Sequence, residues 1–355
     1  MNKQTLPPLP SLLPAYNAEK TVETAVKSLL AQTFTDFEAI IIEDGSTDHT
    51  REILKKLEAS DSRIRVIYKD KNEGLSAGRN SGIRAAVGTY LGFLDADDWI
   101  EPTLLETVYS KGIRQNSDLI LFGYSHDTMD AGRTRISVSR KVFMEEQTLC
   151  TKEEIIKAAA VSDTHKLFAY SCTKLYRRQL IVDHGLSFPR QTLIEDFIFN
   201  CQFWNLIRKL TILDSTGYHY IKASSDALTQ KFLPDYYEII DLRYQNIRSL
   251  IAENGLFHGE ISEQLANVHI KHLLAGMIRD CSDKSGYTRS DRLRRIRSVL
   301  NSESAKEAAS LARGHSRQEI VCNFVFKSHC PWLNLLFSSI LYQMQTRSNA
   351  FDKLK

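Results

Sequence analysis

Between residues 11 and 124, short apolar runs alternate with helix-length amphipathic segments, and this alternation constrains the fold more than any other feature of the chain. The apolar runs are predicted to be strands, at residues 38–44, 64–70, 90–95 and 118–124. The segments with helical spacing lie at residues 18–32, 47–60, 75–87 and 101–115. This order predicts βαβ units, and therefore an α/β fold with a mostly parallel sheet covered by helices on both faces.

Polar clusters follow the predicted strands. They read PAYN at 14–17, EDGSTD at 43–48 and DADD at 95–98. In open α/β sheets ligands bind beyond the carboxyl ends of the strands. We therefore expect the three clusters to converge on one crevice.

The cluster DADD places Asp95, Asp97 and Asp98 directly after a buried strand, where three carboxylates need a counter-charge. Hard divalent cations such as Mg²⁺ and Mn²⁺ take oxygen ligands, and Mg²⁺ commonly uses one or two carboxylates together with substrate phosphates. Asp95 and Asp97 are thus candidate metal ligands, with solvated loop acids as the alternative. Asp98 is interpreted as a cap of the helix that follows.

Two further segments carry candidate binding groups. Glu43 and Asp44 stand where a strand leaves the core, and a carboxylate there can accept an N–H from a nucleotide base such as uracil. Arg79 lies near the start of a glycine-containing helix and can fork onto phosphate oxygens, although a solvated arginine is the commoner outcome. The segment is neither a Walker loop nor a dinucleotide fingerprint.

Glu195 and Asp196 open an otherwise apolar segment at 192–207 that is predicted to be a helix. Acidic residues stabilise a helix N-terminus, which explains them structurally. Alternatively, one of the two carboxylates points into the crevice and acts as a general base.

The rest of the chain is less informative. Residues 125–150 suggest a hairpin or an irregular crossing segment, a helix is predicted at 152–161, and from about residue 235 the signals are helical. We assign residues 1–230 to one domain, with a nucleotide-binding part at 11–124 and an acceptor and catalytic part at 125–230. Residues 231–355 are assigned to a helical C-terminal region.

Composition excludes several classes of protein. A formal net charge of +3 favours no nucleic-acid partner, and the six cysteines lack metal-ligand spacing and are expected to be reduced. Prolines interrupt the apolar start, and no run of about 18–20 uncharged apolar residues exists, so neither a signal peptide nor a spanning helix is expected. We expect a cytoplasmic protein, at most peripheral at the inner face of the membrane, with 231–355 offering a membrane contact or a homo-oligomer interface.

Taken together, these segments resemble the family 2 glycosyltransferases, which are inverting enzymes with the GT-A nucleotide-sugar-binding fold. The resemblance covers about residues 11–225, and the closest subgroup builds bacterial capsule, exopolysaccharide or surface glycopolymers. Matching segments occur in the family's order at residues 14–48, 72–83, 88–102, 172–181 and 194–200.

The resemblance implies roles for individual residues. Asp44 matches the acid that binds the base N3–H, and Arg79 the basic residue near base and phosphates. Asp95 and Asp97 resemble the DxD pair, with Asp95 nearer the ribose and Asp97 the direct ligand of Mn²⁺ or Mg²⁺. Asp196 matches the catalytic base, with Glu195 as its acidic neighbour. The remaining implied nucleotide-sugar contacts are Pro14, Ala15, Tyr16, Asn17, Asn72, Gly74 and Ala96.

Residues 216–230 resemble the strand and loop that cover the diphosphate in this family, with His219 as an additional candidate metal ligand. Three departures from the family pattern stand out. Glu43 replaces the first acid of DDGS, Gly78 stands where Ala is commoner, and prolines occupy the first strand. Because proline is disfavoured in central strands, we expect only Ser11 to Leu13 to pair well and the first ten residues to lie outside the sheet.

The resemblance implies transfer of a sugar, with a UDP-sugar as the expected donor, to a hydroxyl of a saccharide or lipid-linked saccharide acceptor. A nucleotidyltransferase is the nearest alternative enzyme, but it would normally show a glycine-rich basic loop after the first strand. A non-catalytic nucleotide-sugar-binding or scaffold protein of a polysaccharide assembly is the alternative from another class.

Overall fold

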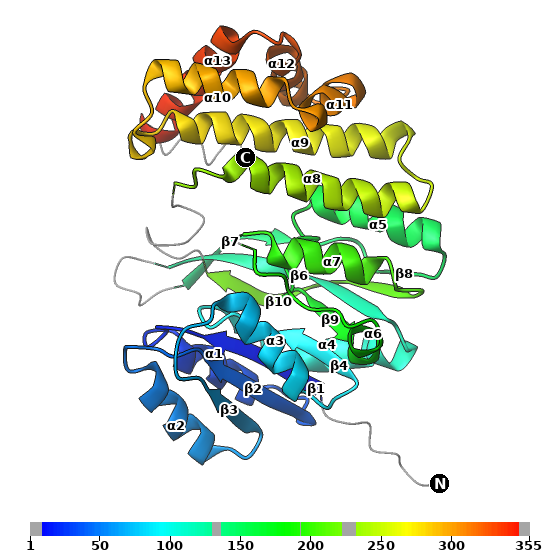
Figure 1. The fold of residues 1–355 in the computed structure, drawn as a ribbon. Coiled ribbons are helices and arrows are strands. Elements are labelled where there is room, and N and C mark those ends of the chain that lie inside the picture. Colours follow the sequence, from blue (N-terminus) through cyan, green and yellow to red (C-terminus); the bar gives the residue numbers. More distant parts are fainter. Residues whose placement is uncertain (1–8, 130–135, 192, 222–231, 348–355) are drawn as a thin grey trace. The chain divides into compact units, whose positions relative to one another are not determined.

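The computed structural model describes residues 9–129, 136–191, 193–221 and 232–347, and the chain divides into two compact units, Met1–Ser225 and Asp226–Lys355 (Figure 1). Unit 1 contains a sheet whose strands run in the order β3-β2-β1-β4-β9-β6-β10-β5, with β7 paired to β6 and β8 to β10. The strands are β1 (Leu9–Ala15), β2 (Phe37–Glu43), β3 (Ile64–Tyr68), β4 (Tyr90–Phe93), β5 (Trp99–Ile100), β6 (Leu119–Met129), β7 (Ile136–Val142), β8 (Gln147–Leu149), β9 (Lys174–Arg177) and β10 (Leu210–Ile221).

The helices of unit 1 connect these strands. They are α1 (Val22–Leu30), α2 (Thr50–Ser60), α3 (Leu75–Ala85), α4 (Leu104–Lys111), α5 (Lys152–Thr164), α6 (Arg178–Asp183) and α7 (Glu195–Trp204). Strands β3, β2, β1 and β4 are parallel neighbours, as are β6 and β10, whereas β9 is antiparallel to both β4 and β6. The chain passes through β1, β2 and β3 and returns to β4, so right-handed crossovers place α3 on the face opposite α1 and α2. The predicted α/β fold class is confirmed.

Strand β1 corrects the expectation that the prolines keep the first ten residues out of the sheet. It begins at Leu9, contains Pro10 and Pro14, and pairs with β2 along its whole length. Leu9 N–H donates toward β2, and Leu12 C=O accepts from Leu94 N–H on the β4 side. Backbone groups alternate along a strand, so Pro10 and Pro14 face β4. That strand pairs only with Ser11 and Leu12, so neither proline removes a ladder hydrogen bond.

The turn after β2 requires a glycine. Gly45 has a φ of +70°, and a Cβ atom there would lie 2.4 Å from the backbone carbon of Lys71. Both the left-handed conformation and the close approach exclude a side chain. The turn thereby brings the end of β2 against the segment that leads into α3.

The hairpin suggested for residues 125–150 exists as β6 and β7, and the helix expected at 152–161 is α5. A capping box formed by Thr151 and Glu154 fixes the start of α5. The antiparallel strand β9 was not predicted. It follows the segment 171–173, and its insertion between β4 and β6 brings that segment into the middle of the unit.

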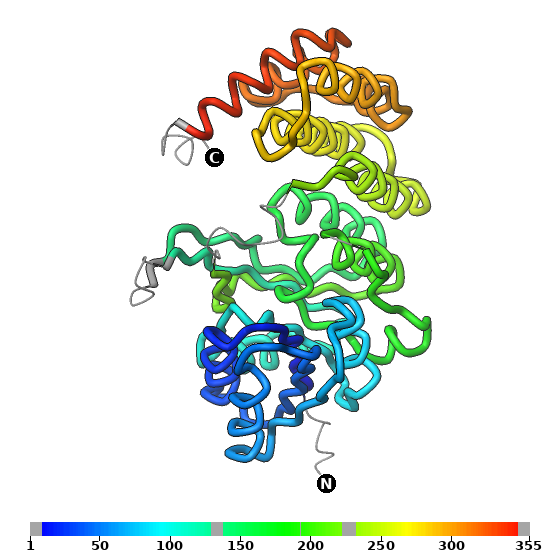
Figure 2. The backbone as a smooth tube through the Cα atoms, turned by 60° about the vertical axis from the view of Figure 1, so that its left-hand side comes forward, coloured from blue at the N-terminus to red at the C-terminus, as the bar shows by residue number. Residues whose placement is uncertain are grey.

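Unit 2 is helical, as predicted. Its helices are α8 (Tyr236–Glu253), α9 (Gly259–Asp280), α10 (Arg289–Leu300), α11 (Glu303–Leu311), α12 (Arg317–Lys327) and α13 (Pro331–Arg347) (Figure 2). Ile270, Met277, Ile296 and Phe326 lie in a shared core beside α9. Pro331 opens α13, a position where proline is tolerated because the first N–H needs no partner. Among the described residues, none of the helices combines the length and apolarity needed to cross a membrane.

Candidate active site

Arg79 of α3 lies at the centre of the site and joins three carboxylates from two other parts of the chain. Its side chain is 3% exposed. Nη2 donates to Asp95 Oδ1 at 3.1 Å, and Nη1 donates to Glu195 Oε1 at 3.1 Å and also to Asp196 Oδ1. Asp95 follows β4, whereas Glu195 and Asp196 form the first turn of α7. The structure therefore brings together the strand-end acids and the acids of the predicted helix.

The counter-charge beside Asp95 is thus the guanidinium of Arg79. Binding of a divalent cation by Asp95 and Asp97 stays a prediction. The role of Arg79 as a contact to base and phosphates stays a prediction, because the described hydrogen bonds of its guanidinium all go to carboxylates. Its ring neighbour is Phe188, whose centroid lies 5.3 Å from the guanidinium carbon.

Three carboxylates share the one guanidinium of Arg79, and the pKa values of acids at this site are raised, mainly by burial. Burial and the charge of Asp196 raise the pKa of Glu195 to about 7, although Arg79 opposes the shift. Asp97 reaches solvent, yet desolvation of its carboxylate and the charge of Asp95 raise its pKa to about 6. Burial also raises the pKa of Asp95, which Arg79 only partly offsets. The site holds an excess of negative charge.

This excess fits a divalent cation. Within the described residues Asp97 forms no ion pair, and no group of three His, Cys, Asp or Glu side chains is arranged to hold a metal by itself. Mg²⁺ is commonly bound by one or two carboxylates, and phosphate oxygens of a substrate take other ligand positions of the cation. Asp95 and Asp97 are the residues that would hold the cation.

Asp98 does not cap the following helix, which corrects the expectation from sequence. The residue before α4 is Thr103. Asp98 is instead buried and accepts hydrogen bonds from Tyr218 Oη at 2.6 Å and from Ile221 N at 2.9 Å, both on β10. Burial and the charge of Asp97 raise its pKa well above the usual range. Asp98 therefore fixes the loop of Asp95 and Asp97 to β10.

His219 is held by two acids and is not available as the additional metal ligand suggested by sequence. Nδ1 lies 2.9 Å from Asp127 Oδ2, and Nε2 lies 3.2 Å from Glu101 Oε1. The imidazole also stacks on Trp99 with ring centroids 3.8 Å apart. Of the strand and covering loop predicted for 216–230, the strand belongs to β10, and residues 222–230 lie outside the described residues.

Asp44, Asn72 and Gly74 come together at the end of β2. Asp44 Oδ2 accepts from Gly74 N at 2.9 Å, Oδ1 lies 2.9 Å from Lys69 Nζ, and Asn72 Oδ1 also accepts from Gly74 N at 2.8 Å. Glu43 turns the other way and pairs with Arg51 at 2.6 Å. Glu43 therefore has a structural role, while binding of the base by Asp44 stays a prediction.

The loop after β1 lies beside the turn of Gly45. Asn17 accepts a hydrogen bond from Thr47 N at 2.9 Å, and Tyr16 is 46% exposed. Ala15 is buried and pairs with Glu43, and a Cβ atom on Gly78 would lie 3.3 Å from the ring of Pro14. Ala96 is half-buried between the two acids of the DxD pair. Contacts of these residues with a nucleotide stay predictions.

Ser171, Lys174 and Asn200 were missed by the sequence reasoning. Ser171 donates to Asp196 Oδ2 from its backbone N at 2.9 Å and from Oγ at 2.8 Å. Lys174 is fully buried and donates to the carbonyl oxygens of Leu167, at 2.6 Å, and Tyr170, while Asn200 Nδ2 donates to Phe168 O at 2.7 Å. Burial lowers the pKa of Lys174 to about 7. The lysine in the mostly uncharged strand segment CTKLY is the sequence feature that could have indicated a buried polar site here.

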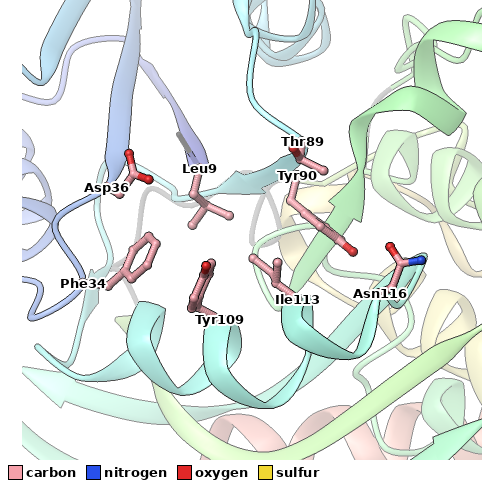
Figure 3. Close-up of a pocket in the computed structure, with 8 residues that line it drawn as sticks. All are labelled: Leu9, Phe34, Asp36, Thr89, Tyr90, Tyr109, Ile113 and Asn116. Atoms are coloured by element: carbon pink, nitrogen blue, oxygen red, sulfur yellow. The ribbon is translucent and has the colours of Figure 1, made fainter. Parts of the chain in front are cut away.

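A small cavity lies at the other end of the strands. Figure 3 shows its lining, which includes Leu9 and Tyr90, the first residues of β1 and β4. Tyr90 Oη donates to Ser117 O at 2.6 Å. None of the predicted site residues lines this cavity, so the candidate site remains at the carboxyl ends of the strands.

The pKa of Glu195 predicts a pH-dependent stability difference. A carboxyl whose pKa rises from 4.5 to about 7 on folding stabilises the folded protein below about pH 4.5, and this contribution is lost as the pH rises through 7. Glu195→Gln cannot ionise and avoids the loss. We expect urea denaturation to show the variant to be more stable than the parent by about 1–3 kcal/mol at pH 8, with the difference shrinking toward pH 5.

Glu153→Gln is the matched control for this experiment, since Glu153 also lies in the first turn of a helix but is 62% exposed. Its stability difference from the parent is expected to stay within about 0.5 kcal/mol between pH 5 and pH 8. A Glu195→Gln difference that does not grow with pH would contradict a raised pKa.

Comparison with known proteins identifies the family. The family described as "Glycosyl transferase family 2" matches residues 12–184. EpsH of Bacillus subtilis strain 168, a glycosyltransferase by name, is 30% identical over 82% of this chain and 82% of its own, and EpsJ of the same strain is 29% identical over 85% and 86%. The crystal structure of S. aureus TarS 1-349 in complex with UDP-GlcNAc matches the fold with a TM-score of 0.63 at 20% identity, over 95% of this chain and 92% of that chain. The chain is a glycosyltransferase with the GT-A fold and belongs to glycosyltransferase family 2.

Proposed function

We propose that this glycosyltransferase moves a sugar, with inversion, from a UDP-sugar to a hydroxyl of a saccharide or lipid-linked saccharide acceptor in the synthesis of a cell-surface polysaccharide. The reaction takes place on the cytoplasmic side of the membrane. The names of the relatives support the class of reaction, and the UDP-GlcNAc bound to TarS supports a UDP-linked donor. Membership of family 2 removes the nucleotidyltransferase alternative.

The observation that carries the proposal is the junction at Arg79, where Asp95 meets Asp196 through one guanidinium. Asp95 is the acid proposed to lie next to the donor, and Asp196 is the acid proposed to act on the acceptor. The two therefore border the same space. We propose that the donor sugar lies between these acids, with its anomeric carbon toward Asp196 of α7. An acceptor hydroxyl entering from that side attacks opposite the diphosphate, and this geometry inverts the configuration.

Each residue of the site has its own role in the proposed reaction. Asp196 accepts the proton of the acceptor hydroxyl, and Ser171 and Arg79 hold the carboxylate in position from its two oxygens. Lys174 and Asn200 hold the carbonyl groups of the segment that precedes Ser171. Positioning of this kind supplies a large part of enzymatic acceleration. A divalent cation bound by Asp95 and Asp97 would neutralise charge on the diphosphate.

A donor screen tests the proposal. We expect UDP to raise the melting temperature in the presence of Mn²⁺ or Mg²⁺ and much less after treatment with EDTA, because a ligand that binds only the folded state stabilises it. At least one UDP-sugar should be hydrolysed slowly without acceptor. Asp97→Asn should lose the metal-dependent part of the shift, whereas Asp183→Asn, which alters an exposed acid at the end of α6, should keep it.

Two results would contradict the proposal. Preferential stabilisation by GDP and turnover of GDP-sugars would show that the donor assignment is wrong. Failure to bind any nucleotide sugar under any metal condition would contradict the proposed donor and the proposed role of the metal.

A further inference from the structure

Helix α13 buries two polar side chains and exposes several apolar ones, although it also packs Leu335 and Phe337 against the core of unit 2. Asn334 and Ser338 are fully buried, whereas Trp332, Leu336 and Ile340 are 52%, 58% and 48% exposed. Asn334 Nδ2 donates to Val325 O at 3.0 Å, so the polar face is tied into unit 2. A surface helix normally buries its apolar side chains and exposes its polar ones. The exposed apolar side chains indicate that the outer face of α13 is a contact surface.

The exposed apolar side chains form a continuous stripe. Trp332, Leu336, Ile340 and the exposed Met344 follow one another at intervals of four residues, which places them on successive turns of one helix face. At a rise of about 1.5 Å per residue the stripe is about 18 Å long. Scattered exposed apolar residues are ordinary, but a stripe of this length is typical of a contact surface.

Arginines of α10 border this stripe. The guanidinium of Arg289 lies 4.5 Å from the ring centroid of Trp332. Among the described residues Arg292 forms no ion pair, and its buried Nε has no hydrogen-bond partner. A cavity of about 450 Å³ is lined by Arg289, Arg292, Trp332, Leu335, Leu336 and Ser339. The cavity thus combines two cationic groups with an apolar wall.

We propose that this α13 surface, made of Trp332, Leu336 and Ile340 with Arg289 and Arg292, binds the surface of a membrane rich in anionic phospholipid. Lipid headgroups supply phosphate oxygens for the arginines, and the adjoining acyl region receives the apolar stripe. Tryptophan is favoured at this boundary because its ring is amphipathic. None of the described helices, α13 included, is long and apolar enough to span a membrane, and the exposed apolar stripe favours a helix that lies in the interface.

The charge of the arginines would make the surface prefer anionic to neutral membranes. This preference does not depend on the transfer reaction. Each basic residue near an anionic membrane strengthens binding several-fold, and salt weakens this contribution. The sequence suggested that 231–355 makes a membrane contact or a homo-oligomer interface, but it did not indicate which residues form the contact. The observed pairing of cations with an exposed apolar stripe favours the membrane, since a self-complementary interface would bring the arginines of two copies together.

Vesicle binding of the full-length protein tests the proposal. We expect co-sedimentation with vesicles of phosphatidylglycerol and phosphatidylcholine to be at least about tenfold stronger than with phosphatidylcholine alone, and to weaken in 0.5 M salt. Arg289→Gln with Arg292→Gln should reduce binding about tenfold, as should Leu336→Ser with Ile340→Ser. Lys55→Gln with Lys56→Gln removes the same charge from exposed positions of α2 and should leave binding unchanged.

Tryptophan fluorescence provides an independent readout. The chain has three tryptophans, of which Trp204 is buried and Trp332 is exposed. Brominated phosphatidylcholine in the anionic vesicles should quench part of the emission, and Trp332→Phe should abolish that quenching while the far-ultraviolet circular dichroism is retained. Equal binding to neutral and anionic vesicles, or unchanged binding by the stripe variants, would overturn the proposal. A dimer in light scattering that the stripe variants dissociate would assign the surface to a second copy and would also overturn it.

Discussion

Asp196→Asn is expected to lower the turnover number by about 10²–10⁴-fold, the usual contribution of general-base catalysis. The substitution preserves the size of the side chain but removes its ability to accept the proton of the acceptor hydroxyl. Affinity for UDP should be unchanged, because the acids proposed to bind UDP and its metal, Asp44 and Asp97, lie on other segments. The turnover number and the dissociation constant for UDP, measured on the same preparation, check this expectation.

Glu195→Gln is the informative comparison, since Glu195 shares Arg79 with Asp196 and has a pKa of about 7. We expect it to retain turnover within about tenfold of the parent, and Asp183→Asn to retain all of it. If Glu195→Gln were the more damaging substitution, the base would be Glu195. Sugar transfer by Asp196→Asn at the parent rate would remove Asp196 from the mechanism.

Arg79→Met is expected to lower the free energy of unfolding by about 3–5 kcal/mol at pH 8, the range found when one partner of a buried ion pair is removed. The variant leaves Asp95, Glu195 and Asp196 together without their shared cation. The loss should be smaller at pH 5, because Glu195 is then largely protonated. Urea denaturation at the two pH values measures both effects.

Arg84→Met is the matched control on the same helix. Arg84 is exposed and donates to Ser81 Oγ at 2.9 Å, so its loss should cost no more than about 0.5 kcal/mol. Arg79→Lys keeps the charge but cannot reproduce the forked contacts of a guanidinium, and it should lie between the two. Equal stability of Arg79→Met and Arg84→Met would show that the carboxylates do not depend on this cation.

The sequence predicted the features that depend on neighbouring residues. The alternation of strands and helices, the acids at the strand ends and the order of the family segments are all local patterns, and the α/β fold and the family follow from them. For 125–150 the sequence left a hairpin or an irregular crossing segment open, and the structure has the hairpin; the helical region expected after 235 is confirmed. It failed at β1, because whether a proline removes a hydrogen bond depends on which neighbour its backbone faces.

Only the tertiary structure decided how the charges are matched. Arg79 and Asp196 are 117 residues apart, and no local pattern indicates that they share a hydrogen bond. Asp98 is likewise 120 residues from Tyr218, and Ser171 reaches Asp196 only because β9 is inserted between β4 and β6. Periodicity and propensity act over a few residues and can be read along the chain. The partner of a buried charge is set by which distant segments pack together, and that is settled when the sheet assembles.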